Sequence, residues 1–238
     1  MADSNSLPGL FVTGTDTDVG KTWVTAGIAS WLRKKGRRPG IIKPVATGLA
    51  DPCAPDSDAA IVLRAGGWPV TPDSIAMANP IHFREPAAPT VAARAEGKSC
   101  EWTQVVDAVR RSMIGWANAG ADVLLVEGAG GVCCPLAEGG KTMLELIQAL
   151  DFPALVVARK SLGTLSHTIS AVRLLSTGPT RVAGVVLNCL PDEDPHGLAE
   201  RTAAEELAMH IAPVPVLYDG PGDFDRVPWL DLPAVARW

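Results

Sequence analysis

The sequence lacks both a long apolar run and a pattern of paired cysteines. No stretch of its 238 residues approaches the roughly 20 consecutive apolar residues that a membrane-spanning helix needs. The beginning, MADSNSLPGL, has neither the basic region nor the apolar stretch of a signal peptide, so we expect a cytoplasmic protein. Its five cysteines are odd in number and include no C-x-x-C pair, which argues against a disulfide framework or a zinc site.

The sequence also lacks an excess of basic residues. It has 21 Lys and Arg against 26 Asp and Glu, which gives a formal net charge of -5. This balance argues against a protein whose main task is to grip nucleic-acid phosphates or an anionic membrane surface. We therefore expect no nucleic-acid partner and no membrane partner, and we expect any bound anion to be held locally.

What the sequence does have is an alternation of short β-rich runs and longer helical patterns. Its length and its 47% of hydrophobic residues predict one core and a single domain over residues 1–238. Strands are predicted at GLFVTG, GIIKPV, DVLLVEGAGG, ALVVAR and RVAGVVLN, and helices at about 20–35, 58–65, 102–118, 142–150, 164–175 and 195–210. This order predicts a three-layer α/β fold, with a mainly parallel central sheet covered by helices on both faces. Roughly the last 25 residues, rich in Pro, Gly and Asp, are predicted to be loop.

A phosphate-binding loop follows the first predicted strand. The segment GTDTDVGKT runs from Gly14 to Thr22, between the strand GLFVT and the helical pattern WVTAGIASWLRKK. Backbone N–H groups at such a turn bind phosphate, the lysine neutralises the terminal phosphates, and the threonine hydroxyl ligates Mg²⁺. The loop has five residues between its glycines, where the common P-loop has four. The context predicts a P-loop NTPase fold that binds a nucleoside triphosphate with Mg²⁺.

Three charged residues near element ends have two interpretations each. Glu127 ends an apolar strand and is either a solvated acid or a metal partner of the phosphate loop. Asp58 either belongs to a helix N-cap, in Asp-Ser-Asp, or is a second acidic metal partner. Lys43 closes a predicted strand and is either solvated or an anion-binding cation.

Several motifs, in their order along the chain, resemble the dethiobiotin synthetase family. They are FVTGTDTDVGKT, KPVATG, DSDA, NPIHFREPAAP, VEGAGG and LGTLSHT, and they span roughly residues 10–190. The five-residue spacing of the phosphate loop is also typical of this family. The resemblance implies that ATP, Mg²⁺ and carbon dioxide convert 7,8-diaminopelargonic acid into dethiobiotin, ADP and phosphate. A carbamate of one amine is phosphorylated, and the second amine then closes a cyclic urea.

The resemblance also implies roles for individual residues. Catalysis is assigned to Lys21, Lys43 and Thr17, of which Lys43 bridges the carbamate and the phosphate. The Mg²⁺ site maps onto Thr22, Asp58 and Glu127. Asn188 corresponds to a purine-reading asparagine, and its alternative interpretation is a turn residue. The implied ATP site comprises Asp18, Val19, Gly20, Lys21, Thr22, Trp23, Asp58, Glu127, Gly128, Ala129, Gly130 and Asn188.

The substrate site implied by the resemblance lies across the interface of a homodimer with shared active sites. The helix start in LGTLSHT receives the distant carboxylate of the substrate, because backbone N–H groups suit an anion. The implied substrate-binding residues are Thr17, Lys43, Thr47, Gly163, Thr164, Leu165 and Ser166. The family commonly has asparagine in place of Ser166 and glutamate in place of Asp18. His167 is interpreted as a packed or helix-associated histidine, because the chemistry assigns it no proton. The PWL at 228–230 resembles an adenine-side segment of the family.

Two other ATP-dependent classes share this architecture. Amidoligases related to cobyrinic acid diamide synthase normally carry a glutaminase domain, for which this chain has neither the length nor a C-G-x-G-like nucleophile segment. ParA/MinD-like switch ATPases usually carry an extra lysine early in the loop, where this chain has TDTDV. Their membrane-targeted members also end in a basic amphipathic helix, which this acidic chain is not expected to form.

Overall fold

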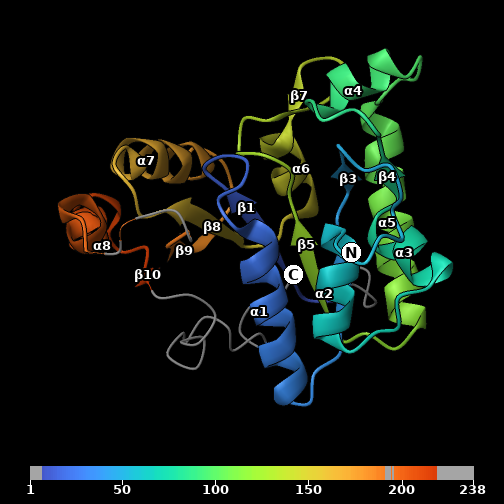
Figure 1. The fold of residues 1–238 in the computed structure, drawn as a ribbon, viewed down its shortest axis with the longest axis horizontal. Helices are drawn as coiled ribbons and strands as arrows, with labels where there is room; N and C mark the ends of the chain where they lie inside the picture. The colour runs from blue at the N-terminus through green and yellow to red at the C-terminus, as the bar shows by residue number, and fades with distance from the viewer. Residues whose placement is uncertain (1–6, 191–193, 195, 219–238) are drawn as a thin grey trace.

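A parallel sheet forms the centre of the computed structural model, which describes residues 7–190, 194 and 196–218 (Figure 1). The order of its six strands is β10-β9-β8-β1-β5-β2, and all neighbouring pairs are parallel. The chain first builds the sheet to one side of β1 and later to the other, so β1 lies at the topological switch point where such sheets bind ligands. The strands are β1 (Gly9–Gly14), β2 (Pro39–Ile42), β5 (Val123–Glu127), β8 (Ala154–Arg159), β9 (Val182–Asn188) and β10 (Val216–Tyr218).

The helices include all six that the sequence predicts, with small differences at their ends. Two further helices, α3 and α4, are not predicted, because each has seven residues, about two turns, and begins with proline. Such short segments carry no apolar period that distinguishes a helix from a loop. The helices are α1 (Lys21–Lys34), α2 (Asp58–Gly66), α3 (Pro72–Ala78), α4 (Pro89–Ala95), α5 (Trp102–Asn118), α6 (Met143–Leu150), α7 (Thr164–Leu175) and α8 (Leu198–Ile211).

Helices cover both faces of the sheet. Helices α1 and α2 pack against each other. A Cβ atom added to Gly66 of α2 would contact Pro39 and Ile41 of β2, whereas one added to Gly40 would contact Trp116 of α5. Because alternate residues of a strand point to opposite faces, α2 and α5 lie on opposite sides of β2. The predicted three-layer α/β fold is confirmed.

Short strands account for the remaining differences from the prediction. The run GIIKPV is not one strand: β2 ends at Ile42 and β3 (Val45–Ala46) pairs with β4 (Ile81–His82), because Pro44 has no N–H to continue the ladder. Strands β6 (Pro135–Ala137) and β7 (Lys141–Thr142) form an antiparallel pair. The predicted C-terminal loop is wrong where β10 joins the sheet. Residues 219–238 of that segment, including 228–230, lie outside the described residues.

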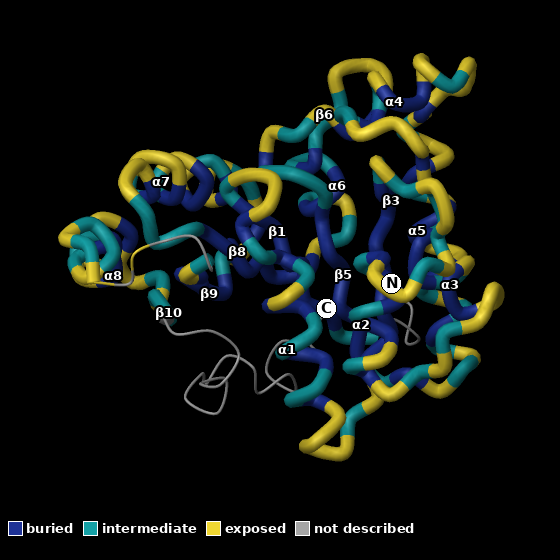
Figure 2. The backbone as a smooth tube through the Cα atoms, viewed as in Figure 1, coloured by how far each residue is buried: buried dark blue, intermediate teal, exposed yellow. Residues whose placement is uncertain are grey.

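The core is built from the strands and from the helix faces that cover them. Strands β1 and β5 are buried at every residue, as expected of parallel strands that helices cover on both faces. Figure 2 shows this as dark blue strands inside a shell of helices whose outer sides are exposed. Among the residues that the structure describes, no helix combines the length and apolar character needed to cross a membrane.

Close packing at Gly40 generates a stability prediction. A Cβ on Gly40 would lie 2.7 Å from Cβ and Cγ of Trp116, whose indole is fixed by a 2.7 Å hydrogen bond from Nε1 to the Ile41 carbonyl. We expect Gly40→Ala to lower the free energy of unfolding by about 1–3 kcal/mol through overpacking. Urea denaturation measures this change.

The matched control is the same substitution at Gly115, inside α5. Within 4 Å its added Cβ would meet only Sδ and Cγ of the flexible Met77 side chain. Alanine in a helix interior is favoured over glycine by about 0.5–1 kcal/mol, so Gly115→Ala should be neutral or stabilising. Equal stability of Gly40→Ala and the unsubstituted protein would contradict this description of the core.

Candidate active site

A cavity of about 590 Å³ lies at the carboxyl ends of β1, β2 and β5. The phosphate loop follows β1, Lys43 follows β2, and Glu127 is the last residue of β5. Parallel strands end at one edge of a sheet, so these three segments meet there. The residues with predicted roles that line the cavity are Thr17, Asp18, Lys21, Lys43, Thr47, Asp58, Ala129 and Gly130.

Asn188, at the end of β9, supports the phosphate loop. Asn188 is 6% exposed, and its Nδ2 donates a hydrogen bond of 3.0 Å to the carbonyl of Val19. Gly20 has φ 90°, and a Cβ at this position would lie 2.0 Å from Asn188 Nδ2. Glycine is therefore required at position 20 by both its conformation and the close approach of Asn188. Lys21 folds over the loop, and its Nζ donates to the carbonyl of Asp16 at 2.7 Å.

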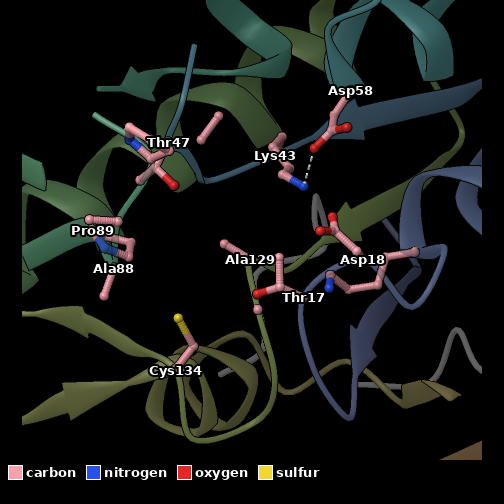
Figure 3. Close-up of a pocket in the computed structure, with 14 residues that line it drawn as sticks. Thr17, Asp18, Lys43, Thr47, Asp58, Ala88, Pro89, Ala129 and Cys134 are labelled. Carbon is pink, nitrogen blue, oxygen red and sulfur yellow. Dashed lines mark ion pairs between the residues drawn. The ribbon is translucent and has the colours of Figure 1, made fainter. Parts of the chain in front are cut away.

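Lys43 lies between two carboxylates. Its Nζ is 2.6 Å from Asp58 Oδ2 and 2.6 Å from Glu127 Oε1; Figure 3 draws the first contact as a dashed line. The Thr22 hydroxyl donates to the same Glu127 oxygen at 2.8 Å. Because β5 lies between β1 and β2, its final residue reaches both the helix of the phosphate loop and Lys43.

Burial decides between the interpretations that the sequence left open. Lys43 is 6% exposed and Glu127 is 2% exposed, so the interpretation of either residue as a solvated strand end is wrong. The N-cap of α2 is Ser57, whose Oγ accepts a hydrogen bond from the Ala60 N–H at 3.3 Å. The capping interpretation thus applies to Ser57, while the carboxylate of Asp58 contacts Lys43.

The charges in the cavity shift one another's pKa values. Burial, followed by the charge of Lys43, lowers the pKa of Lys21 from 10.5 to about 8. Burial also acts to lower the pKa of Lys43, but Glu127 and Asp58 outweigh it and hold this pKa above its usual value. For Asp58, burial acts to raise the pKa, but the charge and hydrogen bond of Lys43, together with Thr22 and Lys21, hold this pKa below its usual value. Lys43 is therefore a permanent cation, and Lys21 gains from any anion placed beside it.

The residues predicted to bind Mg²⁺ fit such an ion. The Oε2 atom of Glu127 is buried and has no hydrogen-bond partner among the described residues, although the other oxygen has two. In nucleotide sites Mg²⁺ takes one or two carboxylates and completes its shell with phosphate oxygens and water. The described part of the chain holds no cluster of three or more His, Cys, Asp or Glu residues suited to a metal. An ion here would therefore take its further ligands from water or from the nucleotide.

Comparison with known proteins identifies the family. The AAA domain family matches residues 8–220. The ATP-dependent dethiobiotin synthetase BioD of Rhodococcus jostii is 43% identical over 199 residues, which cover 83% of this chain and 80% of that protein. The chain belongs to the dethiobiotin synthetase family. The dethiobiotin synthetase BioD of Methylobacterium nodulans is 36% identical over 204 residues, covering 84% of this chain and 88% of that protein. The resemblance that the motifs indicated is confirmed.

A solved structure supports the fold alone. A DUF1611 family protein from Anabaena variabilis superposes with a TM-score of 0.52 at 19% sequence identity. The alignment covers 96% of this chain and 57% of that protein, so this chain spans little more than half of its length. The α/β architecture of this chain thus also occurs in a protein with another family name. The similarity concerns the fold and carries no information about activity.

Some residues that the resemblance to dethiobiotin synthetases singled out lie away from this cavity. Trp23 is 63% exposed in the first turn of α1. The start of α7 lines, through Thr164, a separate cavity of about 120 Å³ that the phosphate loop also lines with Thr15, Asp16 and Val19. There the Thr164 hydroxyl donates to the Arg159 carbonyl at 2.5 Å, so this hydroxyl stabilises the turn between β8 and α7. Ser166 and His167 are exposed on α7, and His167 is thus helix-associated but not packed.

One wall of the cavity was not predicted. It consists of residues 86–89 at the start of α4, together with Ala46 and Cys134. Figure 3 shows Ala88 and Pro89 across the cavity from Thr17, with Cys134 at a third side. Residues 86–89 belong to NPIHFREPAAP, a motif that resembles the dethiobiotin synthetase family but whose residues were assigned no role from the sequence. The signal in the sequence that could have indicated this wall is the pair of small residues between two prolines in this motif.

The double contact of Lys43 generates a prediction about Mg²⁺. In Lys43→Met the carboxylates of Asp58 and Glu127 lose their shared cation. Breaking a buried ion pair costs about 3–5 kcal/mol, and we expect about 3 kcal/mol here because the Asp58 side chain is 44% exposed. Millimolar Mg²⁺ should then raise the melting temperature of Lys43→Met more than that of the unsubstituted protein, without nucleotide. Thermal unfolding with and without Mg²⁺ measures this.

The control is Lys34→Met, at the exposed end of α1, which should respond to Mg²⁺ as the unsubstituted protein does. If Lys43→Met keeps full stability and ignores Mg²⁺, the two carboxylates do not form a common cation site.

Proposed function

We propose that this chain is an ATP-dependent dethiobiotin synthetase, which forms the cyclic urea of dethiobiotin from 7,8-diaminopelargonic acid and carbon dioxide with Mg²⁺. The observation that carries the proposal is the position of Lys43, a buried cation on the wall of the 590 Å³ cavity beside the phosphate loop. The substrates come from the family, whose members in Rhodococcus and Methylobacterium bear this name. A cavity of this size suits a small molecule together with the phosphate end of a nucleotide.

The reaction has to bring two anions together. One amine of the substrate forms an N–C bond to carbon dioxide and loses a proton, which gives a carbamate. A carbamate oxygen then attacks the γ-phosphorus as the bond to ADP breaks. The second amine attacks the carbamate carbon, loses a proton, and phosphate leaves with the oxygen that joined it to that carbon.

Fixed positive charge solves the approach of carbamate to γ-phosphate. Lys43 and Lys21 both line the cavity before any substrate arrives, and preorganised charge stabilises the transition state without reorganisation. Mg²⁺, held by Thr22, Asp58 and Glu127, supplies further neutralisation of the phosphates when it is bound. In this proposal Thr17 contacts the reacting end of the substrate and Thr47 holds the diamine. Ring closure is intramolecular, so positioning supplies most of the rate.

The nucleotide in this proposal follows the phosphate loop toward β9. Backbone N–H groups of residues 18–23 face the phosphates, and residues 128–130 turn closely beside them. Asn188 uses its Nδ2 on the loop, which leaves Oδ1 as the acceptor for a purine amino group. In this proposal the Nδ2 of Asn188 supports the phosphate loop, while its Oδ1 contacts the base.

A homodimer completes the site in our proposal. The start of α7, residues 163–166, would bind the substrate carboxylate in the cavity of the partner subunit. Two observations support this. Residues 163–166 do not line the cavity that holds Lys43 in the same chain, and the neighbouring Leu162 is 91% exposed. A two-fold interface suits a long substrate whose carboxylate lies far from its amines.

Product formation is the direct test. Pure protein with diaminopelargonic acid, bicarbonate and Mg-ATP should yield dethiobiotin, detected by mass, with one ADP and one phosphate for each ring. ADP release at full rate without the diamine would reject the proposal in favour of a switch ATPase.

Lys43→Gln should separate binding from chemistry. We expect ATP affinity to stay within a few-fold of the parental value while the rate falls at least about 100-fold, because the lost charge acts when carbamate and phosphate meet. Calorimetric titration with ATP and single-turnover product formation measure the two quantities. Lys34→Gln is the control for charge at an exposed site. A loss of ATP affinity with an unchanged maximal rate is the result that this role does not permit.

Shared sites can be tested by mixing two inactive variants. Ser166→Glu places an anion where the carboxylate is proposed to bind, and its exposed side chain leaves the fold intact. In a mixed dimer with Lys43→Gln, shared sites put both lesions in one site and none in the other. Random mixing of equal amounts should restore about a quarter of parental activity, since half the dimers are mixed and half their sites intact.

The contrary outcome is equally clear for this pair. Mixed dimers that are confirmed by native mass spectrometry and show no recovered turnover would place each site within one chain. A protein that remains monomeric at assay concentration would reject the shared site as well.

A further inference from the structure

Two prolines interrupt the main-chain pairing beside Lys43. Strands β3 and β4 pair in parallel, with the first residue of one opposite the first residue of the other. Counting back along this register, Pro44 lies opposite Pro80, and Lys43 lies opposite Asn79. Proline has no N–H, so the ladder of hydrogen bonds cannot continue through this step. The chain therefore needs another means of holding Lys43 against its neighbour.

The side chain of Asn79 fills this break. It is 3% exposed, and its Nδ2 donates to the carbonyl of Lys43 at 2.9 Å and to the carbonyl of Ile81 at 2.9 Å. The main-chain N–H of Lys43 donates to the carbonyl of Ala78 at 2.5 Å. Both main-chain polar groups of Lys43 are thus held by two adjacent residues of the other segment.

The other end of the amide shows that this arrangement is not optimal for stability. The Oδ1 atom of Asn79 is buried and has no hydrogen-bond partner among residues 7–190, 194 and 196–218. A buried acceptor without a partner lowers stability, so its presence calls for an explanation. A primary amide is a short side chain that places two donor hydrogens on one nitrogen, which is what two facing carbonyls require. The unpaired Oδ1 belongs to the same amide group as these two donor hydrogens.

The paired segments continue from Asn79 to the walls of the cavity. Beyond β3 and β4, the N–H of Phe83 donates to Ala46 O at 2.9 Å, and the N–H of Leu49 donates to Phe83 O at 3.0 Å. One segment carries Lys43 and Thr47, and the other leads to the wall at 86–89. Asn79 therefore stands at the base of a ribbon that forms two sides of the cavity.

We propose that Asn79 is a positioning residue for the reaction, which acts through the main chain of Lys43 and keeps its ammonium between Asp58 and Glu127. This rests on the function proposed for Lys43. The two contacts of the ammonium are both 2.6 Å, so they leave little tolerance for a shift of the strand end. A displacement of about 1 Å in a reacting constellation can cost about 100-fold in rate.

Kinetics with a matched control test the proposal. Asn79→Ala removes both donors and Asn79→Ser keeps one, so we expect kcat to fall about 10- to 100-fold in the first and less in the second. The affinity for ATP should stay parental in both. Gly40→Ala is the control, because it disturbs packing of the same strand β2 without touching the main chain of Lys43. At a temperature where it is folded, it should keep the parental kcat.

Chemical labelling gives a readout that needs no turnover. Lys43 is 6% exposed, so acetic anhydride should label its amine slowly, as measured by peptide mass spectrometry. Asn79→Ala and Asn79→Ser should speed labelling of Lys43 several-fold and leave that of the exposed Lys34 unchanged. Gly40→Ala should label as the unsubstituted protein does. The absence of dethiobiotin formation in the parent would reject the proposed function, while labelling would still decide whether Asn79 fixes Lys43.

Two results would overturn the proposal. One is parental kcat and parental labelling of Lys43 in both Asn79 variants. The other is a joint loss of kcat and ATP affinity that Gly40→Ala reproduces at equal loss of stability, because that pattern marks a purely structural residue. If Asn79→Ala does not fold, Asn79→Ser decides the question by the same measurements.

Discussion

The arrangement of the site depends on one interaction, the contact of the Lys43 ammonium with two carboxylates. Asp58 comes from the start of α2 and Glu127 from the end of β5, and both contacts measure 2.6 Å. Three segments that are distant in sequence are thereby joined at one buried charge. Removal of Lys43 leaves both carboxylates without their shared counter-charge, which is costly for the buried Glu127. The same interaction holds a cation ready for anionic substrates before they bind.

The order of the strands makes this interaction possible. Because β5 lies between β1 and β2, Glu127 lies between the phosphate loop and Lys43 and bonds to both sides. The pKa of Lys21 is lowered to about 8, chiefly by burial and then by the charge of Lys43. A phosphate group beside Lys21 would favour its charged form. The fold, the electrostatics and the membership in the dethiobiotin synthetase family thus point to one use of the cavity.

The sequence predicted those features that depend on local signals. Short β-rich runs marked the strands of the sheet, and the glycine spacing before Lys21 marked the phosphate loop. It left Lys43 and Glu127 with two interpretations each, because only tertiary packing buries them to 6% and 2% exposure. Asn79 received no role, since its partner lies 36 residues away and the pairing across the prolines is not visible in either segment alone. The individual ligand-binding roles remain predictions, including those at the start of α7.

The central claim is that the anion assembled beside Lys43 is a carbamate, which attacks the γ-phosphate. In that sequence of steps, the oxygen that joins the carbamate carbon to phosphorus originates in carbon dioxide and departs with phosphate when the ring closes. Turnover with oxygen-18 bicarbonate, followed by mass spectrometry of the phosphate, follows this atom directly. We expect one labelled oxygen in each phosphate released. Phosphate that carries no label, in a reaction that does form dethiobiotin, would contradict it.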